Sequence, residues 1–420
     1  MFVVEQAERD LAVLRLPQIG RIVASDGVVP WVVLDAAGQP VAPIQEYLRD
    51  FVARGRKPSS VLSYARDLHR WWRFLAAVGV EWDKATSLEV RDLVLWLQAT
   101  PKMLRHPRTA TAATAGRINP VSGKKHVGDD YGARTIRHSN SVIRAFYKYW
   151  IEEVGEGPLV NPVVLERTKG RPNAHHNPLE PYRTGGGIRY NPKVPKRRPR
   201  QMPDERWRDL FAAMGSNRDR AILAFGISTA ARAAELLGVR SIDVDWGNQL
   251  IRVCRKGSGE EQWLQASPEA FVWLRLYLND LGMVLASEDP LWVTLRRRRG
   301  APDTALKRLP LTYDALRAVL RRANAKLGAN WTMHDLRHTC ALRMINDDGL
   351  SLRDVQFILG HDSVTTTEIY LVEDEQKIFE RVRAFHATQG QADVRPGTPA
   401  GGYQQADLDL LFGGRLPNVS

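Results

Sequence analysis

The stretch MHDLRHT, Met333 to Thr339, places two histidines and an arginine within five residues of a basic chain. If a helix begins here, His334, Arg337 and His338 stand at positions i, i+3 and i+4 and project from one side of it. Such a group could bind a metal ion, hold an anion or simply face water. A metal is disfavoured because the guanidinium of Arg337 would repel it. An anion is favoured, since the planar guanidinium matches two oxygens of a phosphate.

Three other stretches hold residues that could act on a bound phosphate. Downstream, LGHDSVTTTEIY (Leu359 to Tyr370) predicts a helix end, then His361, a hydroxyl-rich turn and a tyrosine. Upstream, STAARAAELLGV carries Arg232 on a predicted helix with apolar faces, where Glu235 is the acidic neighbour. In VCRKGSGEE, Lys256 occupies the tip of a predicted hairpin.

Taken singly, each of these residues has a structural explanation that needs no shared site. Arg232 could form a buried ion pair with Glu235, and Tyr370 could be a core or interface aromatic residue. Lys256 in a glycine-containing turn could simply be exposed, and His361 could cap a helix. Their occurrence together, in this order, favours a shared anion site with an acid and a nucleophile.

In this order the residues resemble the tyrosine recombinase family, also called phage-type integrases. The family pattern is an arginine in a T-x-x-R-x-x-E-L helix, a lysine in a β-turn, H-x-x-R, L-G-H and then a tyrosine. All six positions have counterparts in this chain, at Arg232, Lys256, His334, Arg337, His361 and Tyr370. The resemblance is strong over residues 202–387, with mild departures at Ala231 and at Leu371–Val372.

The resemblance implies that the chain cuts and rejoins DNA through a covalent 3′-phosphotyrosyl intermediate, with Tyr370 as the nucleophile. Charge builds on the non-bridging oxygens during phosphoryl transfer, so Arg232 and Arg337 would hold them from two sides. A phenol is a poor nucleophile at neutral pH. Nearby guanidinium groups favour the phenolate, and His334 would accept or orient its proton.

The remaining residues of the expected site serve the leaving oxygen and the phosphate. By the resemblance, Lys256 is the acid that protonates the departing 5′-oxygen, and His361 donates to the phosphate. Asp335 and Glu235 are expected to orient the cations, and His338 to support the site by packing. No metal and no cofactor is expected, because the phosphodiester energy is kept in the protein–DNA bond until a 5′-hydroxyl attacks.

Composition points to a globular protein with a polyanionic partner. The 420 residues, 44% of them hydrophobic, suffice for two or three domains with cores. The net charge of +13 favours a nucleic acid as partner over an anionic membrane surface, and the resemblance implies double-stranded DNA. Cys254 and Cys340 stand far apart, so neither a disulfide framework nor a cysteine zinc site is expected. The absence of a long apolar run and of a basic leader predicts a cytoplasmic, nucleoid-associated protein without membrane attachment.

The predicted fold is mainly α with a small antiparallel sheet, an α+β arrangement in two domains. After an N-terminal extension, residues 1–40, apolar residues at helical spacing predict four amphipathic helices within 41–160. By pattern, this bundle resembles the SAM-like core-binding domain of the family. A polar, basic segment at 101–132 interrupts the bundle and could contact phosphates or be a solvated insertion.

A basic linker and a second domain follow the bundle. Residues 161–201 contain many Pro, Gly and Asn residues and end in KVPKRRPR, which marks a domain boundary. Residues 202–387 form the expected catalytic domain, mostly helical, with short strands at 242–245, 250–255 and 262–264. In the tail, residues 388–420, an apolar patch from Leu408 to Phe412 could dock on a neighbouring protomer.

The resemblance also implies an assembly and a class of reaction. Family members form a C-shaped clamp around duplex DNA and act as homotetramers on synapsed sites, in some cases with accessory proteins. Three functions are compatible with the residues: a recombinase or integrase of a mobile element such as a transposon, a type IB topoisomerase-like nicking and resealing enzyme, and a catalytically silent DNA-binding protein. The presence of all six family positions disfavours the third.

Overall fold

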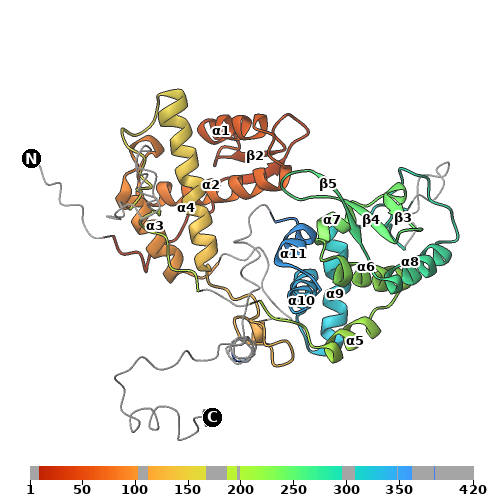
Figure 1. The fold of residues 1–420 in the computed structure, drawn as a ribbon. Helices are drawn as coiled ribbons and strands as arrows, with labels where there is room; N and C mark the ends of the chain where they lie inside the picture. Colours follow the sequence, from red (N-terminus) through yellow and green to blue (C-terminus); the bar gives the residue numbers. More distant parts are fainter. Residues whose placement is uncertain are drawn as a thin grey trace, which may run out of the picture. The chain divides into compact units, whose positions relative to one another are not determined.

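Helices dominate the computed structural model, which divides into two units (Figure 1). Unit 1 comprises Met1–Arg197 with Gly328–Asn330, and unit 2 comprises Arg198–Leu327 with Trp331–Ser420. The structure describes residues 9–102, 112–166, 187–195, 199–295, 308–347 and 349–361, together with Arg383. Tyr370 and the tail from residue 388 onward lie outside the described residues, as do parts of the 101–132 and 161–201 segments. Within the described ranges, no helix is long and apolar enough to cross a membrane.

Unit 1 contains the four predicted amphipathic helices, α1 (Ala42–Ala53), α2 (Pro58–Val78), α3 (Ser87–Ala99) and α4 (Ala133–Lys148). Helix α2 packs against both α1 and α4. Helix α3 begins with a capping box, in which the Leu88 N–H donates to Thr86 Oγ1 (3.2 Å) and the Thr86 N–H donates to Glu89 Oε2 (2.8 Å). Shorter segments complete the unit: the 3-10 turns η1 (Trp82–Lys84) and η2 (Ala112–Thr114), and the π-helical η3 (Tyr149–Val154), which continues α4.

Aromatic side chains join these helices in the core of unit 1. Trp71 Nε1 donates to the Tyr147 hydroxyl at 3.0 Å, and that hydroxyl donates to the Trp82 carbonyl at 2.7 Å. Both Trp71 and Tyr147 are buried, so these bonds satisfy polar atoms that water cannot reach. These two hydrogen bonds connect α2, α4 and η1.

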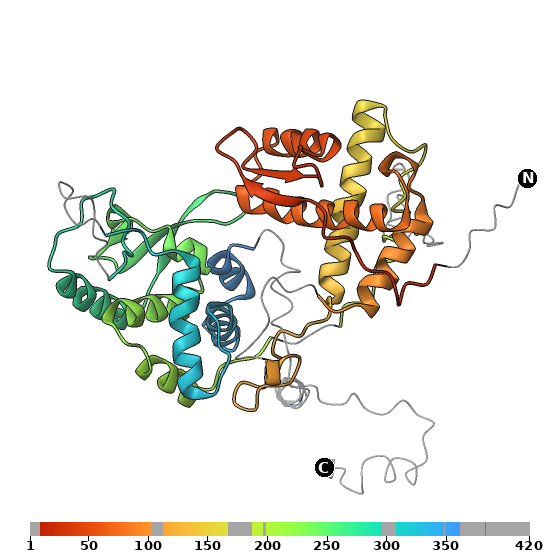
Figure 2. The same cartoon turned by 180° about the vertical axis from the view of Figure 1, so that it is seen from behind.

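The residues before α1 belong to the same core. Strands β1 (Arg21–Ala24) and β2 (Trp31–Leu34) pair antiparallel, with Ala24 opposite Trp31. The hairpin packs on α2, as Figure 2 shows, and Val33 is fully buried in the core. No strands were expected before residue 41, because such short strands show their pairing only when the helices that cover them are in place.

Unit 2 combines helices with a three-stranded antiparallel sheet in the order β3-β4-β5. The strands are β3 (Val244–Asp245), β4 (Leu250–Cys254) and β5 (Glu261–Gln265). The predicted strand at 242–245 is shortened, because Ser241–Asp243 form the 3-10 turn η4. The helices are α5 (Asp204–Ala212), α6 (Asn217–Thr229), α7 (Ala233–Leu237), α8 (Pro268–Leu281), α9 (Tyr313–Leu327), α10 (Met333–Ile345) and α11 (Leu352–Leu359).

Helix α6 lies at the centre of unit 2, where it packs against α8 and α10. Its residues Ala221 to Phe225 are all buried, which is typical of a helix covered on every side. Gly226 permits the close approach of α10, because a Cβ there would lie 2.7 Å from the terminal methyl of Met333. The start of α10 is therefore held tightly against the core.

Candidate functional site

Helix α10 carries Arg337 into the interior of unit 2, where 2% of the residue is exposed. Nη1 donates to the Ala230 carbonyl at 2.6 Å, in the break between α6 and α7. Nη2 donates to the carbonyl of Leu359, the last residue of α11, at 2.7 Å. Nη2 also lies 3.1 Å from His361 Nε2, which accepts because an arginine N–H can only donate. Arg337 therefore joins the break after α6 to the end of α11.

His334 and His338 lie one turn apart on α10, and their ring centroids are 4.1 Å apart at an angle of 63°. His334 is exposed whereas Arg337 is buried, so the imidazoles group together while the guanidinium turns inward. Asp335 Oδ2 accepts from both the N–H and the hydroxyl of Thr332, each at 2.7 Å. This carboxylate caps the start of the helix that presents His334.

Arg232 stands in a break between two helices, not inside a helix as its sequence context predicted. It has extended backbone angles and forms the N-cap of α7. Ala230, two residues before it, adopts the left-handed conformation with φ of 53°. The prediction was wrong because the Ala230 carbonyl is held by Arg337, and this long-range bond has no counterpart in local helical periodicity.

The Glu235 carboxylate connects Arg232 to the β4–β5 hairpin. Oε1 accepts from Arg232 Nη1 at 2.7 Å and from the Lys256 backbone N–H at 3.0 Å. Oε2 accepts from the Arg232 N–H at 2.8 Å and from Arg255 Nη1 at 3.2 Å. Burial raises the pKa of Glu235, but the hydrogen bonds from Arg232 and Lys256 outweigh it, so the pKa lies below its ordinary value. The carboxylate is ionised at neutral pH.

Lys256 lies in the turn of the hairpin, as predicted. The Arg255 N–H donates to the Glu260 carbonyl at 2.8 Å, and the Gly259 N–H donates to the Arg255 carbonyl at 3.1 Å. Gly257 adopts φ of 125°, a conformation that side chains rarely tolerate. The Lys256 side chain is exposed, so a substrate that approaches unit 2 can reach it.

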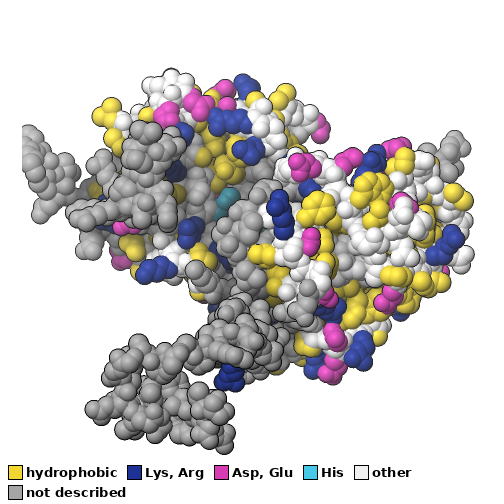
Figure 3. Space-filling model, in the orientation of Figure 1, with side chains coloured by type: hydrophobic (Ala, Val, Ile, Leu, Met, Phe, Trp, Pro, Cys, Tyr) yellow, Lys and Arg dark blue, Asp and Glu magenta, His cyan; other side chains and the backbone are white. Residues whose placement is uncertain are grey.

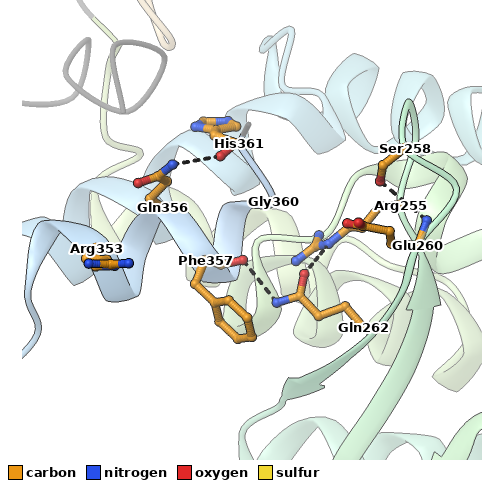
Figure 4. Close-up of a pocket in the computed structure, with 9 residues that line it drawn as sticks. All are labelled: Arg255, Ser258, Glu260, Gln262, Arg353, Gln356, Phe357, Gly360 and His361. Atoms are coloured by element: carbon orange, nitrogen blue, oxygen red, sulfur yellow. Dashed lines mark hydrogen bonds between the residues drawn. The ribbon is translucent and has the colours of Figure 1, made fainter. Parts of the chain in front are cut away.

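A cavity of about 610 Å³ lies between the hairpin and α11 (Figure 4). Gln356 Nε2 donates to the His361 carbonyl at 3.0 Å, and Gln262 Nε2 donates to the Phe357 carbonyl at 3.0 Å. Seven of the nine lining residues have polar or charged side chains, which suits a phosphodiester better than an apolar ligand. It consists of Arg255, Ser258, Glu260, Gln262, Arg353, Gln356, Phe357, Gly360 and His361. No group of three or more His, Cys, Asp or Glu side chains within the described ranges is placed to hold a metal ion.

Arg255 was not among the predicted site residues, although the sequence holds a signal for it. Ile251 and Val253 are the buried residues of β4. Side chains two apart in a strand point to the same face, so residue 255 continues the buried row. An arginine in that row requires internal partners. Tyr370, the predicted nucleophile, lies outside the described residues.

In unit 1, α2 and α4 form a candidate nucleic-acid surface. The helices meet at Ser63 and His138, where Ser63 Oγ lies 3.0 Å from His138 Nε2. Lys and Arg side chains lie on the surfaces of both units (Figure 3). The exposed Lys and Arg residues on α2, α4 and the turn before α2 are Arg54, Arg56, Lys57, Arg66, Arg134, Arg137 and Lys148.

The described part of the basic 101–132 segment folds around Asn119, of which 4% is exposed. Asn119 Oδ1 accepts from the backbone N–H groups of Val121 and Ser122, each at 2.9 Å. An antiparallel bridge joins Ile118 to Lys125. This ordered turn leaves two cations exposed, Arg117 and Lys125.

Comparison with known proteins identifies two matching family models. The model described as phage integrase family matches residues 201–377, and the model described as phage integrase, N-terminal SAM-like domain matches residues 44–115. The tyrosine recombinase XerD of Xanthomonas axonopodis pv. citri is 28% identical over 207 residues, which are 47% of this chain and 66% of XerD. This match spans just under two thirds of that relative's length.

Two further similarities extend over more of the chain. Transposase A from transposon Tn554 of Staphylococcus aureus is 24% identical over 349 residues, covering 80% of this chain and 88% of the transposase. The solved structure of the Tn1549 transposon integrase in complex with circular intermediate DNA superposes with a TM-score of 0.52 at 15% identity. That superposition covers 82% of this chain and 98% of the integrase chain.

Proposed function

The chain belongs to the phage integrase family of tyrosine recombinases, and on that premise we propose that it cuts and rejoins DNA strands at specific sites through a covalent 3′-phosphotyrosyl intermediate. The observation that carries the proposal is one hydrogen-bonded network within unit 2. Glu235 joins Arg232 to the Lys256 turn, and Arg337 joins the backbone beside Arg232 to His361. Segments far apart in the sequence are thereby held together, and His361 also lines the cavity beside α11.

In the proposed reaction, the scissile phosphate binds beside Arg232 and Arg337. Arg232 would stabilise the charge that develops on the non-bridging oxygens by contact, and the buried Arg337 through its positive charge and its bond to His361. Arg232 is the more accessible of the two, with 30% of its side chain exposed, and would contact the phosphate directly. Because Arg337 holds His361 Nε2 as an acceptor, the neutral imidazole carries its proton on Nδ1, from which it would donate to the phosphate.

The proton transfers balance across the step. The Tyr370 oxygen attacks phosphorus and forms the O–P bond, while the bond to the 5′-oxygen breaks. His334 takes the phenol proton, and Lys256 gives a proton to the 5′-oxygen. The reverse sequence rejoins the strand when a 5′-hydroxyl attacks the phosphotyrosine. This scheme uses neither a metal ion nor a cofactor.

We infer that double-stranded DNA is the partner of both parts of the chain. Residues 41–160 would form the core-binding domain and contact phosphates through the basic surface of α2 and α4, while residues 202–387 would form the catalytic domain. The chain would act as a homotetramer on synapsed sites. The similarity to Transposase A supports integration or transposition of a mobile element as its role.

A suicide substrate tests the proposal directly. The full chain is incubated with nicked half-site DNA taken from its own genomic surroundings, and a denaturing gel detects the covalent complex. The wild-type chain should form the complex and Tyr370→Phe should not. A complex that persists in Tyr370→Phe would overturn the assignment of the nucleophile.

A substrate with two separate sites distinguishes recombination from topoisomerase-like activity. Exchange of the flanking DNA between the sites is the outcome expected of a recombinase. Relaxation of supercoils without exchange would identify a nicking and resealing enzyme, and binding without either product would identify a silent DNA-binding protein.

A further inference from the structure

Arg255 is a buried cation that reaches three different parts of unit 2. Its side chain is 4% exposed. Nε donates to Gln262 Oε1 on β5 at 2.6 Å, Nη1 to Glu235 Oε2 on α7 at 3.2 Å, and Nη2 to the Ile358 carbonyl on α11 at 2.6 Å. Figure 4 shows the guanidinium directed from the hairpin toward Gln262.

The end of α11 is the feature that this cation recognises. The last carbonyls of a helix have no partner within the helix and carry partial negative charge. Here each of them accepts from a different side chain. The Phe357 carbonyl accepts from Gln262, the Ile358 carbonyl from Arg255 and the Leu359 carbonyl from Arg337.

Gly360 permits the close approach of Arg255. The glycine ends α11 with φ of 58°, and a Cβ on it would lie 2.7 Å from Arg255 Nε and 2.9 Å from Cζ. His361 follows directly, and its N–H donates to the Gln356 carbonyl at 3.2 Å. The residue before Lys256 therefore packs against the residue before His361.

We propose that Arg255 is a positioning residue that fixes the Lys256 turn to the end of α11, and so sets the place of Lys256 relative to His361 and Arg232. The inference rests on the proposed function, in which Lys256 protonates the leaving oxygen. Arg255 itself does not touch the phosphate in this scheme, because its three named bonds direct it into the protein.

Lysine is the informative substitution at this position. It keeps the charge, but a single ammonium on a flexible stem cannot reach the three acceptors that the planar guanidinium reaches. Gln262→Met is a milder second variant. Gln262 is half-buried on β5, and the change removes one acceptor of Arg255 and the donor to the Phe357 carbonyl. Arg252→Lys is the matched control, because Arg252 lies on β4 and pairs with Asp243 and Glu261.

Hydrogen exchange measured by mass spectrometry on the full chain without DNA tests the link itself. Arg255→Lys should raise amide exchange in two separate peptides, 256–262 and 357–361, by about tenfold or more, because the bonds between them are lost. Gln262→Met should do so to a smaller extent, and Arg252→Lys should not. Unchanged protection in both Arg255→Lys and Gln262→Met would overturn the inference, whether or not the chain cleaves DNA.

Cleavage of a 5′-bridging phosphorothiolate tests the consequence for Lys256. A thiolate leaves without a proton, so this substrate does not need the acid. Arg255→Lys should cleave the ordinary half-site about tenfold or more slowly than wild type, and the sulfur substrate at close to the wild-type rate. Equal losses on both substrates would show that Arg255 does not act through Lys256. Failure of the wild-type chain on both substrates would refute the proposed function, while the exchange experiment would still decide the role of Arg255.

Discussion

Glu235 accepts two hydrogen bonds from Arg232, one from the backbone N–H at 2.8 Å and one from the guanidinium at 2.7 Å. The spacing of three residues lets one carboxylate cap the start of α7 and hold the side chain of the N-cap residue. The same group accepts from the Lys256 turn and from Arg255. A buried carboxylate with this many donors couples the geometry of the site to the stability of unit 2.

We expect that coupling to depend on pH. The pKa of Glu235 is lower in the folded chain than its ordinary value of 4.5, so its contribution to stability is full above that value and is lost as the pH falls through the folded pKa. Glu235→Gln should lower the free energy of unfolding by about 3 kcal/mol at pH 7, with a smaller difference below about pH 4. Urea unfolding of both proteins, at pH 7 and below about pH 4, measures this difference in the free energy of unfolding. Glu205→Gln, at an exposed position, is the control, and a pH-independent difference for Glu235→Gln would contradict the prediction.

Arg337 should not be replaceable by lysine. Arg337→Lys keeps the charge but cannot reach both the Ala230 and the Leu359 carbonyls, so we expect a loss of about 2 kcal/mol in stability. Formation of the covalent complex should slow by about a hundredfold, because the positive charge beside the phosphate and the bond that holds His361 are displaced. Arg343→Lys on the same helix, where the native arginine pairs with Asp204, is the matched control. Similar rates for the two variants would argue against the role of Arg337.

The basic surface of α4 should govern the salt dependence of DNA binding. Each phosphate contact that is lost should lower the slope of log K against log salt by about 0.9. We therefore expect a shallower slope for the double variant Arg134→Ala, Arg137→Ala, measured by fluorescence anisotropy on a short duplex. The control is the double variant Arg49→Ala, Lys84→Ala, which removes the same amount of charge from other exposed positions of unit 1. If both double variants lowered the slope equally, net charge and not this surface would be responsible.

The two cysteines should differ in reactivity. Burial raises the pKa of the Cys340 thiol to about 12, whereas Cys254 is exposed at the end of β4. Iodoacetamide at pH 8 should therefore modify Cys254 in the folded chain and both cysteines in urea, as peptide mapping would report. Modification of Cys340 without denaturant, at a rate near that of Cys254, would indicate that α10 opens in solution.

Local pattern was sufficient for much of the fold. Apolar spacing predicted α1 to α4, and the capping box at the start of α3 depends only on Thr86 and on Glu89, three residues later. The turn at Lys256 and the helix end at Gly360 were predicted from glycine, since both need backbone angles that other residues resist. Each of these features depends on residues that are close together in the sequence, so it can be predicted without knowledge of the tertiary structure.

The features that the sequence did not predict depend on contacts between segments far apart in the chain. The N-terminal hairpin takes its place by packing on α2, and the break at Arg232 depends on Arg337, about a hundred residues later in the chain. The alternation along β4 indicates that Arg255 is buried, but its bond to the Ile358 carbonyl exists only because the fold brings α11 to the hairpin.

The sequence by itself determined which groups are present and in which order, since the pattern around MHDLRHT specifies the guanidinium, imidazole, ammonium and phenol groups of the proposed phosphoryl transfer. Only the tertiary structure decided which of them meet. Burial makes each unpaired polar group costly, so Glu235 and the end of α11 gather donors from distant segments. That requirement links Arg232 to the Lys256 turn through Glu235, and Arg337 to His361.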